Sequence, residues 1–221
     1  MQQFNVVISG FDHYEGIDIN PSAEVSTTLA SRGVAGAPEG ADIQVTSVLL
    51  PLSFQNAWPK LHETIEAVHP DVVIATGLKT HAHSVALERC ATNLIDASRP
   101  DVDNVQPRRT PIEPDGPAAY WTRLPLRAIL HDFTEQNIPA TLSSDAGTFV
   151  CNSLFYQLLH WNAQQARTLS GFLSFPKVGD GGLYGSGLSL GQMVAAAEDA
   201  VRATVGYAMQ PFSDEIYADE I

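Results

Sequence analysis

The sequence predicts an α/β protein in which a mostly parallel, twisted sheet lies between helical layers, in one domain spanning residues 1–221. Two observations favour this fold. Strand-like and helix-like segments alternate along the chain, an order typical of parallel strands joined by helical crossovers. The length of 221 residues and the hydrophobic content of 44% are enough for one domain with a full core.

The first half of the chain alternates strand and helix. Residues 4–10, FNVVISG, are a β-rich run ending in glycine, and residues 71–77, DVVIATG, indicate a central strand that is apolar on both faces. A helix over residues 21–32 has Asn20 as its N-cap and Pro21 at its first position. The same patterns predict a strand over residues 42–50 and a helix over residues 54–68.

The second half continues the alternation after an ambiguous stretch. Residues 84–94 fit either a helix or a strand, and residues 99–115 are polar and proline-rich, which predicts a loop. The acidic tail, residues 211–221, is expected to fray. The remaining predictions are helices over 126–136, 150–165 and 190–209, and strands over 140–144 and 169–175.

Composition limits the classes of function. The net charge of −13 argues against a nucleic-acid partner, because the phosphates would be repelled, and mildly favours neutral or cationic substrates. No apolar run approaches the about 20 residues that span a bilayer, and the first residues show no basic region, so no membrane partner and a cytoplasmic location are expected. The two cysteines are too few for a metal ribbon and are judged as separate thiols.

One thiol stands at a position that favours chemistry. In SSDAGTFVCNSLFYQLLH a strand ends near Ser144, a turn follows, and Cys151 opens a helix. The helix dipole and the free N–H groups there favour thiolate and could hold an oxyanion. The alternative is a small buried apolar residue, which is also the interpretation of Cys90. Glu88 is a charge in an apolar stretch and needs a partner, for which neighbouring Arg89 is the simplest choice.

Five segments together resemble one family. They are GFDHYEGIDINPS, ALERCATNLIDA, PIEPDGPAAYWTRLPLRAI, NIPATLSSDAGTFVCNSLFY and SGFLSFP, in the family's order and spacing. With them the chain resembles the pyroglutamyl peptidase I, or pyrrolidone-carboxylate peptidase, family of cysteine peptidases. The resemblance implies an open α/β/α sandwich, removal of an N-terminal pyroglutamyl residue from peptides without a cofactor, a Cys-His-Glu triad, and a homo-oligomer, commonly a tetramer.

The resemblance also implies roles for residues. The family's nucleophile falls on Cys151 and its acid on Glu88, whereas the histidine that ends its Ser-Gly-Phe-aliphatic-His motif falls on Ser174. The family's arginine, ten residues after the acid, falls on Ser98, and Arg99 follows. Whether Arg99 compensates for Ser98 is left open.

The segments expected to bind the substrate also depart from the family pattern. In the ring-binding loop, GFDHYEG, Phe11 and Tyr14 keep the aromatic character while His13 replaces a proline. The glycine-rich stretch becomes Lys-Thr-His-Ala over residues 79–82. The expected substrate-binding residues are Phe11, His13, Tyr14, Leu78 and His81.

A new base could come from His13, His81 or His83, which lie on loops expected at the carboxyl ends of strands. The alternatives are solvated loop histidines and, as a third option, a metal site, although His81 and His83 lie close to Lys79 and no supporting pattern is visible, so no metal is expected.

The prediction is therefore a cysteine-dependent hydrolase that cleaves an N-terminal pyroglutamyl or related small acyl or lactam amide, with altered specificity or mechanism. Its substrate would be a small peptide or N-acyl amino-acid amide. Two alternatives stay open: a catalytically silent ligand-binding homologue, and a biosynthetic enzyme that transfers an acyl or amide group through the same thiol.

Overall fold

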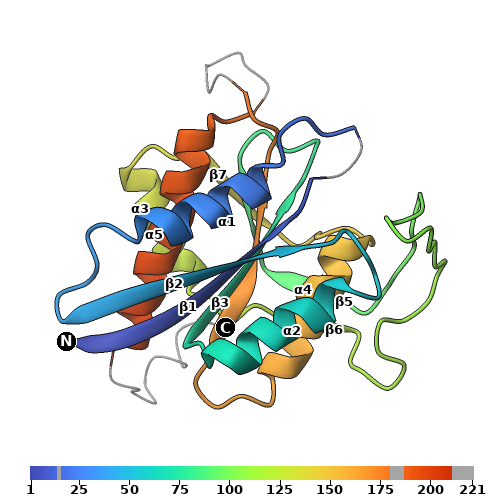
Figure 1. Cartoon of the computed structure of the whole chain (residues 1–221), viewed down its shortest axis with the longest axis horizontal. Helices are drawn as coiled ribbons and strands as arrows, with labels where there is room; N and C mark the ends of the chain where they lie inside the picture. The colour runs from blue at the N-terminus through green and yellow to red at the C-terminus, as the bar shows by residue number, and fades with distance from the viewer. Residues whose placement is uncertain (14–15, 180–186, 211–221) are drawn as a thin grey trace.

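A twisted central sheet organises the computed structural model, which describes residues 1–13, 16–179 and 187–210 (Figure 1). The sheet has the strand order β2-β1-β3-β8-β4-β7. Its strands are β1 (Gln2–Phe11), β2 (Ala41–Leu50), β3 (Val72–Leu78), β4 (Val85–Glu88), β7 (Ala140–Ser143) and β8 (Leu169–Phe175). All neighbouring strands are parallel except β4 and β8. The prediction of a mostly parallel sheet is confirmed.

Helices cover both faces of this sheet, as Figure 1 shows. They are α1 (Pro21–Arg32), α2 (Ala57–Val68), α3 (Leu126–Glu135), α4 (Val150–Asn162) and α5 (Leu190–Ala208). One apolar cluster joins α1, α3 and α5 to one face, and a second joins α2 and α4 to the other. The open α/β/α sandwich is therefore confirmed.

Strand β3 shows how the sequence pattern sets these two layers. Val72 and Ile74 belong to the cluster under α1 and α5, whereas Val73 and Ala75 belong to the cluster under α2 and α4. Successive side chains of a strand point to opposite faces, so a strand that is apolar at every position is buried on both sides. By the same alternation, Gly77 faces α4.

Helix α1 begins as its sequence predicts. The side chain of Asn20 accepts a hydrogen bond from the N–H of Ser22, and Pro21 occupies the first helical position. The Asn20 amide also donates to the carbonyls of Phe11 and Asp12, at 2.8 and 3.1 Å. This buried cap therefore fixes the chain that leaves β1 as well as the start of the helix.

Of the helix and the strand left open for residues 84–94, the structure has strand: β4 is followed by β5 (Cys90–Thr92), which pairs with β6 (Ala119–Trp121) in a separate small sheet. Two helices are shorter than predicted. Helix α2 starts at Ala57 rather than residue 54, because the Ser53 hydroxyl accepts the N–H groups of residues 55 and 56 in a turn. Helix α4 ends at Asn162 rather than residue 165, and the side-chain amide of Asn162 donates a hydrogen bond to the carbonyl of Thr168.

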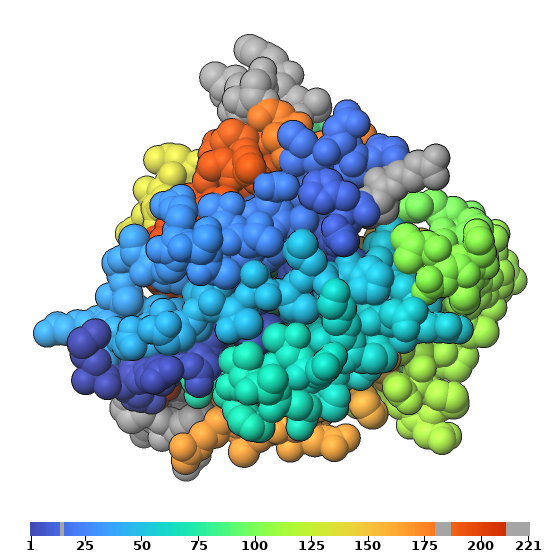
Figure 2. Space-filling model, viewed as in Figure 1, coloured from blue at the N-terminus to red at the C-terminus, as the bar shows by residue number. Residues whose placement is uncertain are grey.

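The predicted loop over residues 99–115 contains no helix or strand, as expected. Figure 2 shows it as a green lobe at one edge of the molecule. The Asp101 carboxylate organises its start by accepting the N–H groups of Phe54, Asp103 and Val105. Within residues 1–13, 16–179 and 187–210, none of the helices has the length and apolarity needed to traverse a bilayer. The predicted fraying of residues 211–221 concerns residues outside the described part of the chain.

Candidate active site

The thiol of Cys151 lies in the first turn of α4, against the end of β3. Strand β7 ends at Ser143, a turn follows, and α4 begins at Val150. A Cβ atom added to Gly77 would lie only 2.9 Å from the Cys151 sulfur, so the missing side chain at Gly77 makes room for the thiol. The thiol occupies the strand-turn-helix position that the sequence predicts, at the carboxyl end of a central strand.

The start of α4 leaves backbone donors without a side-chain partner. Its N-cap is Phe149, which makes no capping hydrogen bond to any described residue, and the Thr148 hydroxyl donates instead to the carbonyl of Asp96. The first N–H groups of a helix have no partner within the helix. These groups, next to the Cys151 sulfur, can therefore receive a developing negative charge.

The resting thiol is not activated, contrary to the expectation that the helix terminus favours thiolate. Burial, followed by the negative charge of Glu88, raises the pKa of the Cys151 thiol to about 12. A hydrogen bond from its own backbone N–H and the positive charges of Arg99 and Lys79 act in the opposite direction but are outweighed. At neutral pH Cys151 is a protonated thiol that needs a base.

Glu88 is the buried carboxylate of this site. It ends β4, is 0% exposed, and accepts hydrogen bonds on Oε1 from Ser174 Oγ at 2.7 Å and Lys79 Nζ at 3.1 Å. Its other oxygen, Oε2, is buried and finds no partner among the described residues. The simple pairing with Arg89 is wrong, because adjacent residues of a strand point to opposite faces and Arg89 is exposed.

Strand register places Ser174 between the other groups. Ser174 pairs with Gly77 on β3 and with Ala86 on β4, so all three share one face of the sheet, and Glu88 lies on that face two residues after Ala86. Cys151 packs onto Gly77 from α4. The structure therefore brings Cys151, Glu88 and Ser174 together on the α4 side of the sheet.

Sequence reasoning gave no role to Lys79, although it noted the residue as a departure. Its ammonium group contacts Glu88 Oε1, the Ser143 hydroxyl at 3.1 Å and the Asp145 carbonyl at 2.6 Å. It thus ties the ends of β3 and β4 to the turn before Cys151. One pattern could have revealed it: Lys79 lies two residues after Gly77, on the side that faces α4.

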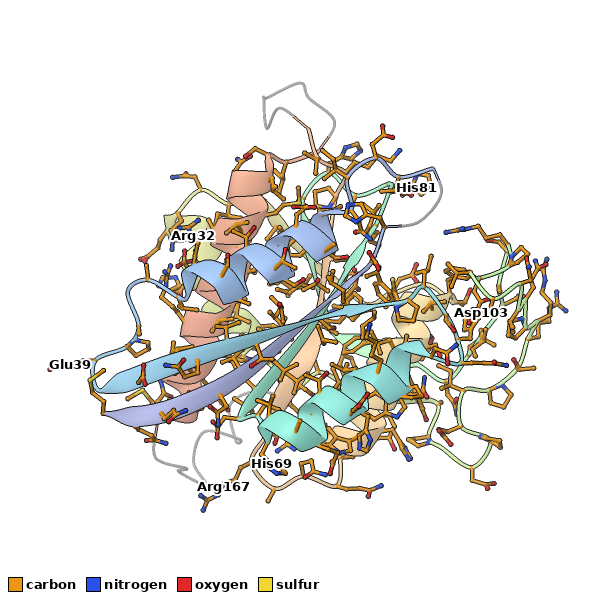
Figure 3. The ribbon with its side chains drawn as sticks, in the orientation of Figure 1. Arg32, Glu39, His69, His81, Asp103 and Arg167 are labelled. Atoms are coloured by element: carbon orange, nitrogen blue, oxygen red, sulfur yellow. The ribbon has the colours of Figure 1, made fainter. Side chains whose placement is uncertain are left out.

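The histidines considered as substitutes all lie at exposed positions. His13 is exposed, with ring nitrogens 3.7 Å from Asp12 and 3.6 Å from Glu24. His81 and His83 are exposed, and Figure 3 shows His81 just after β3, at the opposite end of that strand from His69. No histidine is among the groups that shift the thiol pKa. In the described part of the chain no three His, Cys, Asp or Glu side chains could hold a metal ion.

The predicted ring-binding residues have different surroundings. Phe11 is buried in the apolar cluster against which Cys151 packs, and Leu78 is half-buried at the end of β3. His13 and His81 are exposed, and Tyr14 lies outside the described residues. Arg99 lies over the Phe149 ring, 5.0 Å from its centroid, and its charge reaches the Cys151 thiol.

Comparisons with known proteins agree with this geometry. A family model for pyroglutamyl peptidase matches residues 4–208. A pyrrolidone-carboxylate peptidase of Pseudomonas fluorescens is 38% identical over 200 residues, which cover 90% of this chain and 91% of the relative.

Solved structures give the same result. Pyroglutamyl peptidase I of Bacillus amyloliquefaciens is similar with a TM-score of 0.82 and 32% identity, over 93% of this chain and 98% of that chain. A pyrrolidone carboxyl peptidase of Thermococcus litoralis is similar with a TM-score of 0.83 and 30% identity, over 99% of this chain and 98% of that chain. With the thiol, the carboxylate and the strand order all in place, the chain belongs to the pyroglutamyl peptidase family.

Proposed function

We propose that the protein is a cysteine-dependent amide hydrolase that removes an N-terminal pyroglutamyl or closely related acyl group from small peptides. One observation carries the proposal: the Cys151 sulfur lies beside uncapped N–H groups at the start of α4, on the sheet face that holds Glu88. Nucleophile, oxyanion donors and a carboxylate in one place are the components of thiol-dependent acyl transfer.

The chemistry follows from these positions. The sulfur attacks the acyl carbon of the scissile amide, and the N–H groups of the first turn of α4 hold the oxyanion. The amine then leaves, and water releases the acyl group from the thioester. A pyroglutamyl ring is small and uncharged, which suits the apolar cluster that includes Phe11 and against which Cys151 packs.

Turnover of ordinary pyroglutamyl substrates should be slow. The thiol is protonated at neutral pH, and a serine stands where the resemblance places the family's histidine. A hydroxyl is too weak a base to take the thiol proton, and a positioned acid–base group is typically worth about 10² to 10⁴ in rate. The proposed function therefore includes a mechanism that differs from the family's, because a group other than a histidine at position 174 must take the thiol proton.

A catalytically silent binding protein is the second candidate. The observation that favours it is the same raised thiol pKa, which would leave Cys151 inert if no group accepted its proton. Such a protein would still bind a pyroglutamyl ligand but would release no amine.

A pyroglutamyl amide with a fluorogenic amine separates the two candidates. The hydrolase should release the amine slowly and in proportion to enzyme, and Cys151→Ala should abolish release while pyroglutamate still binds by calorimetry. Binding without any release that depends on Cys151 would select the silent homologue. Neither binding nor release would contradict both.

From the resemblance we also propose that the enzyme is a homo-oligomer, a tetramer as in its family, that acts in the cytoplasm, and that Arg99 supplies the positive charge that Ser98 does not. Light scattering on the purified protein tests the assembly. Comparing Arg99→Ala with Ser98→Ala tests the charge, because only the former should weaken hydrolysis.

A further inference from the structure

We propose that Glu88 is the general base of this enzyme, accepting the Cys151 proton on its Oε2 atom, and that Lys79 is the positioning residue that holds the carboxylate by its other oxygen, Oε1. The inference rests on the proposed hydrolysis and assigns its missing base. In this arrangement Cys151, Glu88 and Lys79 act together, and no histidine carries the proton between the thiol and the carboxylate.

The two oxygens of Glu88 have different surroundings. Oε1 is occupied, because Ser174 Oγ and Lys79 Nζ both donate to it. Oε2 is fully buried and finds no donor among the described residues. A buried carboxylate oxygen without a partner is costly and calls for an explanation, and a catalytic role is one such explanation next to a buried thiol. Oε2 is therefore the open acceptor of the site.

Lys79 cannot be the base itself. An ammonium group carries three donors, and the three acceptors within reach of Lys79 Nζ are Glu88 Oε1, Ser143 Oγ and the Asp145 carbonyl. All three donors are therefore in use, and the nitrogen offers no free position to the thiol. Lys79 instead supplies the positive charge that makes a buried carboxylate tolerable at this position.

The contacts of Ser174 and His13 argue against either of them as the base. The Ser174 hydroxyl is buried and directs its proton to Glu88, so it is a donor to the carboxylate and not an acceptor for the thiol. His13 lies against Asp12 and Glu24. Among the charged groups that act on the thiol from the described part of the chain, Glu88 is the anion, whereas Arg99 and Lys79 are cations.

The proton and electron balance is complete with these groups. As the sulfur bonds to the acyl carbon, the S–H bond breaks and the proton moves to Oε2. When the C–N bond breaks, Oε2 returns that proton to the departing amine. In the second half a water molecule attacks the thioester, Glu88 takes its proton, and the proton passes to the departing sulfur. The net reaction is amide plus water to acid plus amine, with no further reactant.

The test compares Glu88→Gln with the natural protein in hydrolysis of a pyroglutamyl fluorogenic amide and in alkylation of Cys151, followed on its own peptide by mass spectrometry. Loss of the base should lower kcat by about 10²-fold or more with little change in KM. Alkylation should become faster, because removing the Glu88 charge lowers the pKa of the thiol. A purely structural role would also raise KM and lower the urea midpoint, because the face of the sheet that carries the site would be displaced.

Two matched variants complete the test. If Glu88→Gln does not fold, Glu88→Asp keeps the charge and withdraws the carboxylate, and kcat should still fall at constant KM. Lys79→Met should lower kcat with little change in KM, because Glu88 Oε1 loses a donor that fixes the carboxylate, and Lys79→Arg should restore kcat.

The outcomes separate the two proposals. Hydrolysis that depends on Cys151 but survives Glu88→Gln, or that disappears in His13→Ala, His81→Ala or His83→Ala, overturns the role of Glu88 alone. Absence of any hydrolysis that depends on Cys151 overturns the proposed function and this inference with it.

Discussion

The hydroxyl of Ser174 donates a 2.7 Å hydrogen bond to Oε1 of Glu88, within the buried face of the sheet on which Cys151 packs. This bond and the Lys79 ion pair compensate one oxygen of a fully buried carboxylate. The site thus holds a buried carboxylate together with a thiol whose pKa is raised to about 12. The reactivity of Cys151 is therefore governed by the transfer of its proton.

The reactivity of Cys151 should increase steeply with pH. Since burial and Glu88 raise the pKa of the thiol to about 12, the thiolate fraction grows about tenfold per pH unit between pH 7 and pH 10. Alkylation by iodoacetamide, followed on the Cys151 peptide, should show this slope without a plateau. In denaturant the same thiol should level off near its ordinary pKa of about 8.5. Rapid alkylation of the folded protein at pH 7 would contradict the protonated resting state.

Gly77→Ala should disable the site. The added Cβ would lie 2.9 Å from the Cys151 sulfur and 2.9 Å from the Phe172 ring, distances at which one of them must move. Overpacking of this kind typically costs about 1–3 kcal/mol of stability, and displacement of the sulfur should reduce kcat strongly.

The matched control is Gly191→Ala. A Cβ there meets only the Ser189 hydroxyl, at 4.0 Å, on the exposed start of α5. Helix propensity predicts a gain of about 0.5–1 kcal/mol and unchanged activity. Urea unfolding and the fluorogenic assay measure both variants, and equal effects from the two would show that the Gly77 contact is unimportant.

Asn20→Ala should reduce both stability and substrate binding. The side chain caps α1 and holds the carbonyls of Phe11 and Asp12, so its loss removes an N-cap worth about 0.5–2 kcal/mol and loosens the segment that carries Phe11. We expect a lower urea midpoint and a raised KM. Asn56→Ala is the control, because Asn56 makes no capping bond at α2 and is exposed. It should change neither quantity appreciably.

Sequence patterns predicted the layers better than the site. β3 is apolar on both faces over its first four residues and Asn20-Pro21 is a strong helix start, so both could be recognised locally. The antiparallel direction of β4 and the short β5 could not, because a four-residue strand carries no information about its partners. Lys79 and Glu88 lie on different strand ends nine residues apart, and only the register of β3, β8 and β4 shows that they meet.

Ser174→His should raise hydrolysis of pyroglutamyl amides. Ser174 faces α4 beside Gly77 and contacts Glu88, so an imidazole from this position would lie between the carboxylate and the Cys151 sulfur. The carboxylate would orient the ring, and the ring could take the thiol proton and deliver it to the leaving amine. A positioned acid–base group contributes about 10² to 10⁴ in rate, so kcat should rise by about 10²-fold or more. The pH–rate profile should gain a limb near pH 6.5, the ordinary pKa of imidazole.

Cys151→Ala in the Ser174→His background is the control and must abolish the gain, since the new imidazole acts only through the thiol. Ser174→Ala separates the arrival of a base from the loss of a hydroxyl: it removes one donor from Glu88, leaves the Lys79 ion pair, and should lower kcat without adding a limb. If Ser174→His leaves kcat unchanged while Glu88→Gln abolishes hydrolysis, the carboxylate already reaches the thiol directly and an imidazole adds nothing. If both variants leave hydrolysis unchanged, the proton leaves Cys151 by a route that avoids this face of the sheet.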